Sequence, residues 1–251
     1  MLKLYEKDEI RRRLLLDAAW SAYALSDLDE GRFEHAHWFG VADDAAVALL
    51  YCEFPNAVFI YMGSGRTLQR VLAEVPLQAG THLQLQAEAL SLVRERTPVA
   101  VAKPMIRMRL AAPCLVEEDA VPLTAGDAAE LLALYADGGE AGESPDFFFP
   151  SMLEGGCFFG LRREGMLVAA AGTHIVSRGE SAAAIGNVYT HRAHRGRGYA
   201  QVVTSAVVGA LRKAGIETVI LNVAEKNRAA IRVYEKLGFV EHCRFFEAVT
   251  G

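Results

Sequence analysis

Apolar residues recur along the chain with two alternating periods, one typical of strands and one typical of helices. Runs dense in Val, Ile, Tyr and Phe predict strands, and apolar residues three or four positions apart predict helices. In the first half we predict helices over 8–28, after 63–65 and over 87–96, and strands over 45–54, 57–62, 81–86 and 99–110. In the second half we predict helices after 124–127, over 201–214 and after 227, and strands over 157–163, 166–176, 184–190, 218–223 and 239–249. The fold class is therefore α/β.

One order of elements occurs twice: strand, strand, glycine turn, helix, strand, helix, strand. It runs from Ala45 to Leu110 and again from Met166 to Val249. The two segments are hardly alike in sequence, so both a repeated fold and a coincidence of ordinary α/β alternation remain open. Ala111-Ala112-Pro113 separates them, and 251 residues suffice for two domains, which we place at 1–112 and 113–251.

Composition narrows the class of protein. The chain is 52% hydrophobic, enough to build cores, and its net charge of −5 argues against a nucleic-acid partner. Its four cysteines, at positions 52, 114, 157 and 243, form no C-x-x-C pair, so we expect neither a zinc site nor a disulfide framework. The N-terminus lacks an apolar signal region and no apolar run reaches about 20 residues. We expect a soluble cytoplasmic protein, with no membrane partner and no metal.

A glycine-and-arginine segment stands out after the strand at 184–190. It reads Arg195-Gly196-Arg197-Gly198-Tyr199-Ala200 and opens a helix with apolar residues at helical spacing. The start of a helix presents unpaired backbone N–H groups and partial positive charge, and the two arginines add full charge. The segment therefore predicts a site for a phosphate or pyrophosphate group. The alternative is that both glycines are ordinary turn residues.

A second pattern follows about thirty residues later. Residues 227–239 fit N-x-x-A-x-x-x-Y-x-x-x-G-F, with Asn227, Tyr234 and Gly238 at its named positions. We expect Asn227 to cap the helix that follows it and Gly238 to end that helix with a left-handed backbone. Together with the R-x-x-G-x-A pattern of the arginine segment, it resembles the GNAT superfamily of acetyl-coenzyme A-dependent N-acyltransferases. The resemblance covers roughly Cys114 to the C-terminus. It implies tandem GNAT-like domains, each a mixed, mostly antiparallel sheet flanked by helices, with the first half a degenerate copy.

The resemblance also implies site residues. The backbone N–H groups of Arg195, Gly196, Arg197, Gly198, Tyr199 and Ala200 would wrap the pyrophosphate of coenzyme A. The backbone of Val188, Tyr189 and Thr190 would pair with the pantetheine arm and polarise the thioester carbonyl, and Asn227 would contact the same arm. Tyr234 stands where the family has the general acid that protonates the leaving thiolate, although a tyrosine on an apolar helix face is most often a core residue.

The chemistry is compatible with that role. A phenol with a pKa of about 10 gives its proton to a thiolate of pKa about 8.5 at a cost of roughly 2 kcal/mol. The Val188 N–H is our candidate donor to the carbonyl oxygen. The general base stays open among His174, Asn187, Tyr189, Glu143 and Asp146.

The expected reaction transfers an acetyl group from acetyl-CoA to a primary amine, on a small molecule or a peptide, by direct attack in a ternary complex. The alternative is a module that senses acyl-CoA without transfer. Either would be a monomer or a homodimer. Phe147 to Phe149 could be core residues or could line the acceptor pocket. The Gly63-Ser64-Gly65-Arg66 segment could be a vestigial phosphate loop, although a plain turn is favoured.

Overall fold

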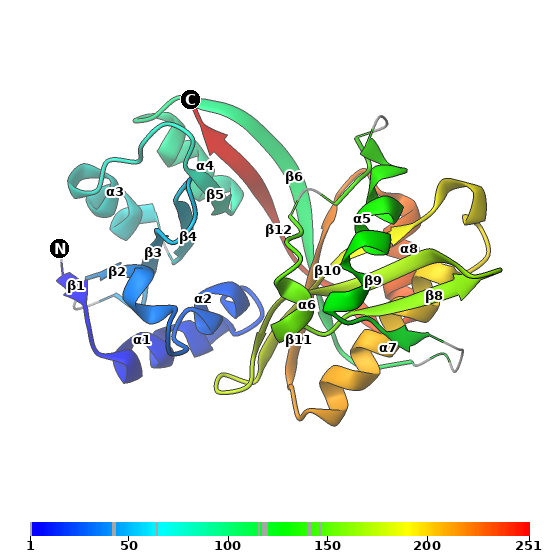
Figure 1. Ribbon diagram of the computed structural model, residues 1–251. Helices are drawn as coiled ribbons and strands as arrows, with labels where there is room; N and C mark the ends of the chain where they lie inside the picture. Colours follow the sequence, from blue (N-terminus) through cyan, green and yellow to red (C-terminus); the bar gives the residue numbers. More distant parts are fainter. Residues whose placement is uncertain are drawn as a thin grey trace. The chain divides into compact units, whose positions relative to one another are not determined.

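The structure, a computed structural model, describes residues 2–41, 44–63, 65–114, 116, 120–139, 142–145 and 147–251 (Figure 1). The chain forms two compact units. The first contains Met1–Arg107, Val223–Lys226 and Glu241–Gly251, and the second contains Met108–Asn222 and Asn227–Val240. This division differs from the predicted domains 1–112 and 113–251, since residues 223–226 and 241–251 lie in the first unit and residues 108–112 lie in the second.

The first unit is a sheet in the order β1-β2-β3-β4-β5-β12. Neighbouring strands are antiparallel except for the parallel pair β4 and β5. The strands are β1 (Leu2–Leu4), β2 (Ala36–Gly40), β3 (Val47–Tyr51), β4 (Val58–Met62), β5 (His82–Leu85) and β12 (Phe239–Thr250). The helices are α1 (Lys7–Leu14), α2 (Ala22–Ser26), α3 (Gly65–Glu74) and α4 (Ala87–Arg94), with 3-10 turns η1 (Leu15–Asp17) and η2 (Phe33–His35). The long strand β6 (Val99–Leu110) follows α4.

The second unit contains the strand order β11-β10-β9-β8-β7. Its neighbours are antiparallel except for the parallel pair β10 and β11. The strands are β7 (Val121–Pro122), β8 (Phe159–Arg163), β9 (Met166–Ser177), β10 (Ala182–Thr190) and β11 (Thr218–Ala224). The helices are α5 (Ala128–Ala136), α6 (Met152–Gly155), α7 (Tyr199–Lys213) and α8 (Arg228–Lys236), with 3-10 turns η3 (Ala125–Asp127) and η5 (Arg192–His194).

The two halves of the chain repeat one topology. Each runs strand, two helices, three antiparallel strands, helix, parallel strand, helix and a long last strand, from β1 to β6 and from β7 to β12. The predicted tandem arrangement of mixed, mostly antiparallel sheets is confirmed. The last strand of each half is divided between the units at Arg107 and at Val240. The end of β12 joins the first unit because it pairs with β5, with Phe246 opposite Leu85 and Val249 opposite His82.

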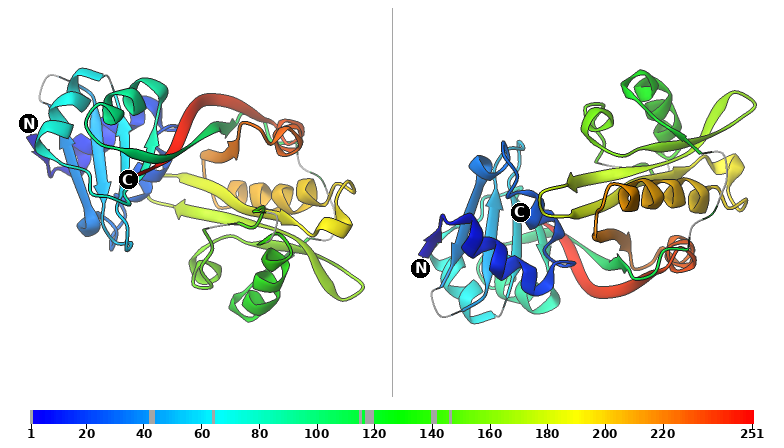
Figure 2. Two further views of the ribbon diagram at one scale, coloured as in Figure 1. Left: turned by 90° about the horizontal axis from the view of Figure 1, so that it is seen from above. Right: turned by 90° about the horizontal axis from the view of Figure 1, so that it is seen from below.

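Helices cover both faces of the sheet in the second unit. Figure 2 shows α5 and α7 on opposite sides of the strands β8 to β10. On the α5 face, Leu131, Leu134 and Tyr135 pack with Phe158 and Tyr189 in one buried cluster. This packing holds the C-terminal ends of α5 and β10 together, and that is where the candidate site begins.

The helix expected over 8–28 is interrupted, which the apolar pattern did not reveal. The chain passes from α1 through η1 into a turn before α2. At the break, the Asp17 carboxylate accepts a hydrogen bond from the backbone N–H of Trp20 (2.9 Å). A side chain that bonds a nearby backbone N–H competes with the helical bond that this N–H would otherwise make, and so favours the break.

Candidate functional site

A bulge in β10 sets the geometry in front of the glycine loop. The register between β9 and β10 shifts between Gly186 and Tyr189, and Asn187 has a left-handed backbone with φ of +53°. The Tyr135 hydroxyl donates to the Asn187 carbonyl (2.8 Å) and ties the bulge to α5. A bulge leaves an extra residue outside the ladder and re-aims its neighbours. The backbone groups of Val188 therefore lie within the bulged segment.

Unsatisfied polar atoms gather along the same run of residues. Six buried side-chain polar atoms in the described part of the chain lack a hydrogen-bond partner, and four of them belong to Asn187, Thr190 and His194. Asn187 is only 5% exposed, yet neither its Nδ2 nor its Oδ1 is paired. Because a buried polar group without a partner is costly, such a cluster indicates a place where a ligand supplies the missing hydrogen bonds.

The loop that follows has the geometry of an anion site. Gly196 and Gly198 have φ of +75° and +81°, and a Cβ at either position would meet nothing within 4 Å. The left-handed backbone is what requires glycine there. The first bond of α7 comes from the Gln201 N–H to the Gly198 carbonyl (2.9 Å), so the N–H groups of Tyr199 and Ala200 precede the helical ladder. The loop thus offers backbone donors in open space and fits a pyrophosphate group.

Asp137, just after α5, is a residue that the sequence patterns did not single out. Its carboxylate accepts hydrogen bonds from the Tyr189 hydroxyl (2.8 Å) and from the Arg192 backbone N–H (2.8 Å). The Arg192 N–H, together with the Tyr189 hydroxyl, lowers the pKa of Asp137 to about 2. Asp137 thus fastens the end of β10 and η5 to α5. No signal in the sequence marked it, because its partners lie more than fifty residues away.

Arg195 has its side chain engaged within the protein. Its Nη2 pairs with Glu143 Oε2 (2.7 Å) and lies 3.4 Å from the Tyr189 hydroxyl, while its Nε donates to the Thr190 carbonyl (3.2 Å). The ion pair links the loop before α6 to the arginine loop. The backbone N–H of Arg195, which carried the sequence-based expectation, donates to the Arg192 carbonyl (3.4 Å).

Helix α8 places the other two predicted site residues. The Asn227 Oδ1 accepts the Ala230 N–H (3.1 Å), so the predicted N-cap is confirmed, and Gly238 has the expected left-handed backbone (φ +90°). Tyr234 is 7% exposed, and burial raises the pKa of its phenol to about 12. Among the described residues its hydroxyl has no hydrogen-bond partner, although it is not one of the fully buried unpaired atoms. Helices α7 and α8 are in contact, which brings the two sequence motifs into one region.

The candidate general bases differ in the partners that their side chains contact. Glu143 pairs with Arg195, which lowers its pKa, and the Tyr189 hydroxyl is bound to Asp137, with burial chiefly raising its pKa. His174 lies directly on the backbone of β10, since a Cβ at Gly186 would be 2.1 Å from its Nε2. The ring of Phe147 meets the His174 ring edge to face at 5.5 Å. Asp146 lies outside the described residues.

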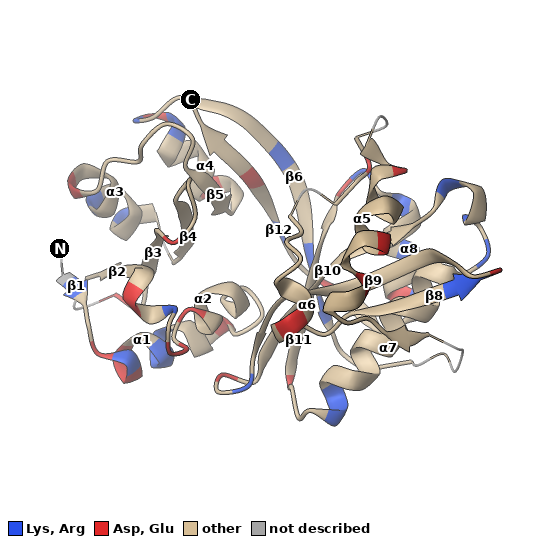
Figure 3. Cartoon of the chain, in the orientation of Figure 1, with Lys and Arg blue, Asp and Glu red and all other residues tan. Residues whose placement is uncertain are grey.

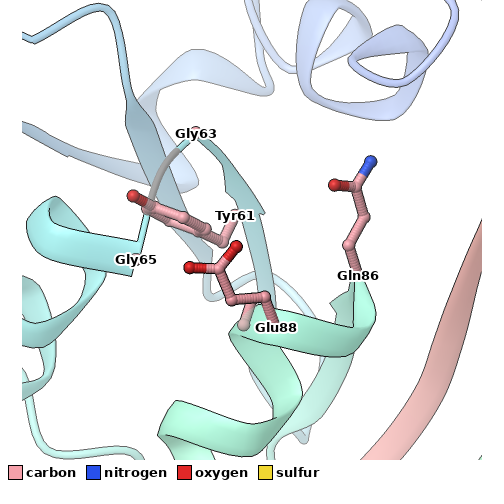
Figure 4. Close-up of a pocket in the computed structure, with 6 residues that line it drawn as sticks. Tyr61, Gly63, Gly65, Gln86 and Glu88 are labelled. Atoms are coloured by element: carbon pink, nitrogen blue, oxygen red, sulfur yellow. The ribbon is translucent and has the colours of Figure 1, made fainter.

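The corresponding turn in the first unit is built differently. A Cβ at Gly65, the first residue of α3, would lie 2.6 Å from Glu88 Oε1. Figure 4 shows the Glu88 carboxylate beside Gly65 and Tyr61 in a small pocket at this turn. A carboxylate at a helix start takes the place that an anion would take and repels a second one. The arrangement supports the plain-turn interpretation of residues 63–66.

No group of three or more His, Cys, Asp or Glu side chains among the described residues could hold a metal ion. No helix among those residues is long and apolar enough to cross a membrane.

Comparison with known proteins agrees with this geometry. Residues 128–239 match the model of the acetyltransferase (GNAT) family. A mycothiol acetyltransferase of Thermobispora bispora is 40% identical over 86 residues, a segment that spans 33% of this chain and only 29% of that protein.

Solved structures resemble more of the chain. A GCN5-related N-acetyltransferase from Sphaerobacter thermophilus has a TM-score of 0.58 at 19% identity, covering 98% of this chain and 94% of its own. A Drosophila protein has a TM-score of 0.72 at 13% identity, covering 99% and 98%. At these identities the likeness shows the fold, which extends over both halves. The match to the acetyltransferase (GNAT) family model is narrower, since it covers residues 128–239, in the C-terminal half of the chain.

Proposed function

We propose that the second unit transfers an acetyl group from acetyl-CoA to a primary amine by direct attack within a ternary complex. The observation that carries the proposal is the open, left-handed Gly196–Gly198 loop at the start of α7, preceded by a bulged strand with unsatisfied buried polar groups. The acceptor belongs to the class of small-molecule or peptide amines. The four cysteines are all unpaired, which supports a reducing compartment such as the cytoplasm.

Backbone groups would hold the acetyl-CoA donor. The N–H groups of residues 195–200 would hold the pyrophosphate of the donor, and the backbone of Val188 to Thr190 would pair with its pantetheine arm. Within the bulge, the Val188 N–H is our candidate donor to the thioester oxygen as charge develops there. Asn227, whose Oδ1 caps α8, would reach the same arm with its Nδ2.

Tyr234 would supply the proton to the leaving thiolate. A phenol pKa of about 12 makes the transfer costlier than a free tyrosine would. Burial acts on thiols in the same direction, however, as it raises the pKa of the Cys157 thiol to about 11. A thiolate formed in a similarly buried place is therefore more basic too, which offsets part of that cost.

His174, whose ring lies on the backbone of β10, would take the proton from the acceptor amine. The Asn187 amide has no basic group and could act only by orienting a water molecule. An imidazole titrates near neutral pH, which suits a general base.

The test is calorimetric titration with acetyl-CoA of the unmodified protein, Gly198→Glu and Gly215→Glu. Gly215, at the other end of α7, has a similar φ of +79° and equally open surroundings, so it is the matched control for backbone strain and added charge. We expect binding by the unmodified protein and by Gly215→Glu, and none by Gly198→Glu. Absence of binding by the unmodified protein would refute the proposed function.

A further inference from the structure

The end of β8 carries two adjacent arginines that serve different partners. Arg162 binds carboxylates of the α5 region, with its Nη2 2.6 Å from Asp127 Oδ1 and a further ion pair to Glu130. Consecutive side chains of a strand point to opposite faces, so Arg163 is directed away from those partners. It lies instead on the first residue of α7, its guanidinium carbon 5.1 Å from the centre of the Tyr199 ring.

Positive charge accumulates at that helix start. Arg163 and Arg197 both hydrogen-bond the Tyr199 hydroxyl and thereby lower its pKa, Arg163 with the larger effect. In the described part of the chain no carboxylate pairs with Arg197. Figure 3 shows the arginine-bearing end of β8 in blue. Two guanidinium groups that meet at one phenol oxygen repel each other, and the positive end of α7 adds to that repulsion.

An anion bound between these groups would relieve the repulsion. Guanidinium groups match phosphate oxygens with two parallel hydrogen bonds, and the exposed backbone of Gly196 and Gly198 leaves room beside them. We infer that Arg163, with Arg197 and Tyr199, forms a second phosphate subsite for the donor nucleotide, separate from the backbone donors of the loop. This inference rests on the proposed function, because it presumes that the donor is coenzyme A.

Coenzyme A carries two phosphate groups that this subsite could bind. One is the pyrophosphate and the other is the phosphate monoester at the 3′ position of the ribose. The monoester carries up to two negative charges and is the better match for two guanidinium groups, whereas the loop N–H groups already offer donors for the pyrophosphate. Comparison of coenzyme A with dephospho-coenzyme A, which lacks only the 3′-phosphate, distinguishes them.

The experiment measures dissociation constants of both ligands by calorimetry for the unmodified protein, Arg163→Gln, Arg163→Lys and Arg162→Gln. Arg162→Gln removes the same charge from the adjacent position of the same strand and is the matched control. For Arg163→Gln we expect coenzyme A to bind roughly ten- to a hundredfold more weakly, the loss of one charge-assisted contact. Dephospho-coenzyme A should bind the unmodified protein and Arg163→Gln equally if the subsite takes the 3′-phosphate. An equal loss for both ligands overturns the inference, because a structural role of Arg163 would weaken the binding of both ligands alike.

Arg163→Lys keeps the charge without the planar fork and should give an intermediate loss, which keeps the test open if Arg163→Gln unfolds. The inference is overturned if Arg163→Gln binds coenzyme A as the unmodified protein does, or weakens no more than Arg162→Gln. Failure of the unmodified protein to bind either ligand would instead refute the proposed function. A merely structural packing of Arg163 on Tyr199 would not change the difference between the two ligands.

Discussion

At the residue scale, Tyr234 combines a buried phenol with a hydroxyl that has no protein partner in the described chain. A core tyrosine usually pairs its hydroxyl, so this arrangement is better suited to a group that meets a ligand. Its raised pKa makes the proposed acid role costly unless the leaving group is itself shielded from water.

We therefore predict that Tyr234→Phe lowers kcat with an assayed amine by roughly two to four orders of magnitude, the usual contribution of a positioned acid or base. The affinity for acetyl-CoA should change little, since the ring remains to pack against Phe239 at 6.2 Å. Steady-state kinetics and calorimetry separate the two effects. If the variant keeps its rate, the acid role is wrong, and a module that binds acyl-CoA without transfer becomes the better hypothesis.

At this scale the sequence did not predict which partners the side chains bind. The motif indicated that Arg195 belongs to the loop, and it does, but its guanidinium pairs with Glu143. Tyr189 was expected to act through its backbone, and its hydroxyl has a separate task on Asp137. Both partners come from segments distant in the chain, so spacing along the sequence carried no information about them.

At the element scale, α8 illustrates a helix whose limits could be read from the sequence. Asn227 caps its start and Gly238 follows its end with φ of +90°, both as expected. These features depend on hydrogen bonds and backbone angles within a few residues, which is why local sequence predicts them. The bulge of β10 is the opposite case, because it depends on pairing with β9 and on the Tyr135 hydroxyl.

The cap yields a prediction for this element. Asn227→Ala removes the acceptor of the Ala230 N–H and should lower the free energy of unfolding by about 1 kcal/mol. Asn227→Asp keeps an acceptor at the same place and should retain most of that stability. Urea unfolding followed by circular dichroism measures both. The prediction is wrong if Asn227→Asp is destabilised as much as Asn227→Ala. Acetyl-CoA affinity should fall in both variants if the Nδ2 contact in the proposed site exists, since both lose that donor.

At the scale of the whole molecule, the two halves keep one topology but differ at the start of the helix after the third antiparallel strand. In the second half that start is an open loop with arginines, and in the first half Glu88 lies against it. If the second unit binds acetyl-CoA as proposed, we expect one such site per chain. The first unit instead holds features of stability, such as Arg107, which is fully buried and donates to Gln84 Oε1 (2.9 Å).

Another such feature is Asp27, which is 8% exposed. Burial raises the pKa of its carboxyl to about 8; Arg32 opposes this shift, and Glu53 and Asp29 add to it. The folded state therefore binds a proton that the unfolded chain, with a pKa near 3.9, has released. Stability from this group is present at low pH and is lost as the pH rises toward 8. Between pH 6 and pH 8 the loss should be roughly 2 kcal/mol.

Asp27→Asn tests this directly, because the amide has nearly the same shape and does not titrate. The difference in unfolding free energy between pH 6 and pH 8 should shrink by that amount, and the variant should be the more stable protein at pH 8. Glu30→Gln, an exposed neighbour, serves as the control and should leave the pH dependence unchanged. An unaltered pH profile for Asp27→Asn would contradict the assignment.

The sequence by itself determined most of the order of strands and helices, the caps of α8, the glycines of the loop and, through two motifs, the resemblance of the second half to the GNAT family. Periodicity, capping and left-handed turns are local, so neighbouring residues suffice to specify them. Tertiary structure alone decided how β12 divides between the units, where β10 bulges, and which partners hold Asp137, Arg195 and Arg163. These depend on pairings between segments far apart in the chain, and no single stretch of sequence records them.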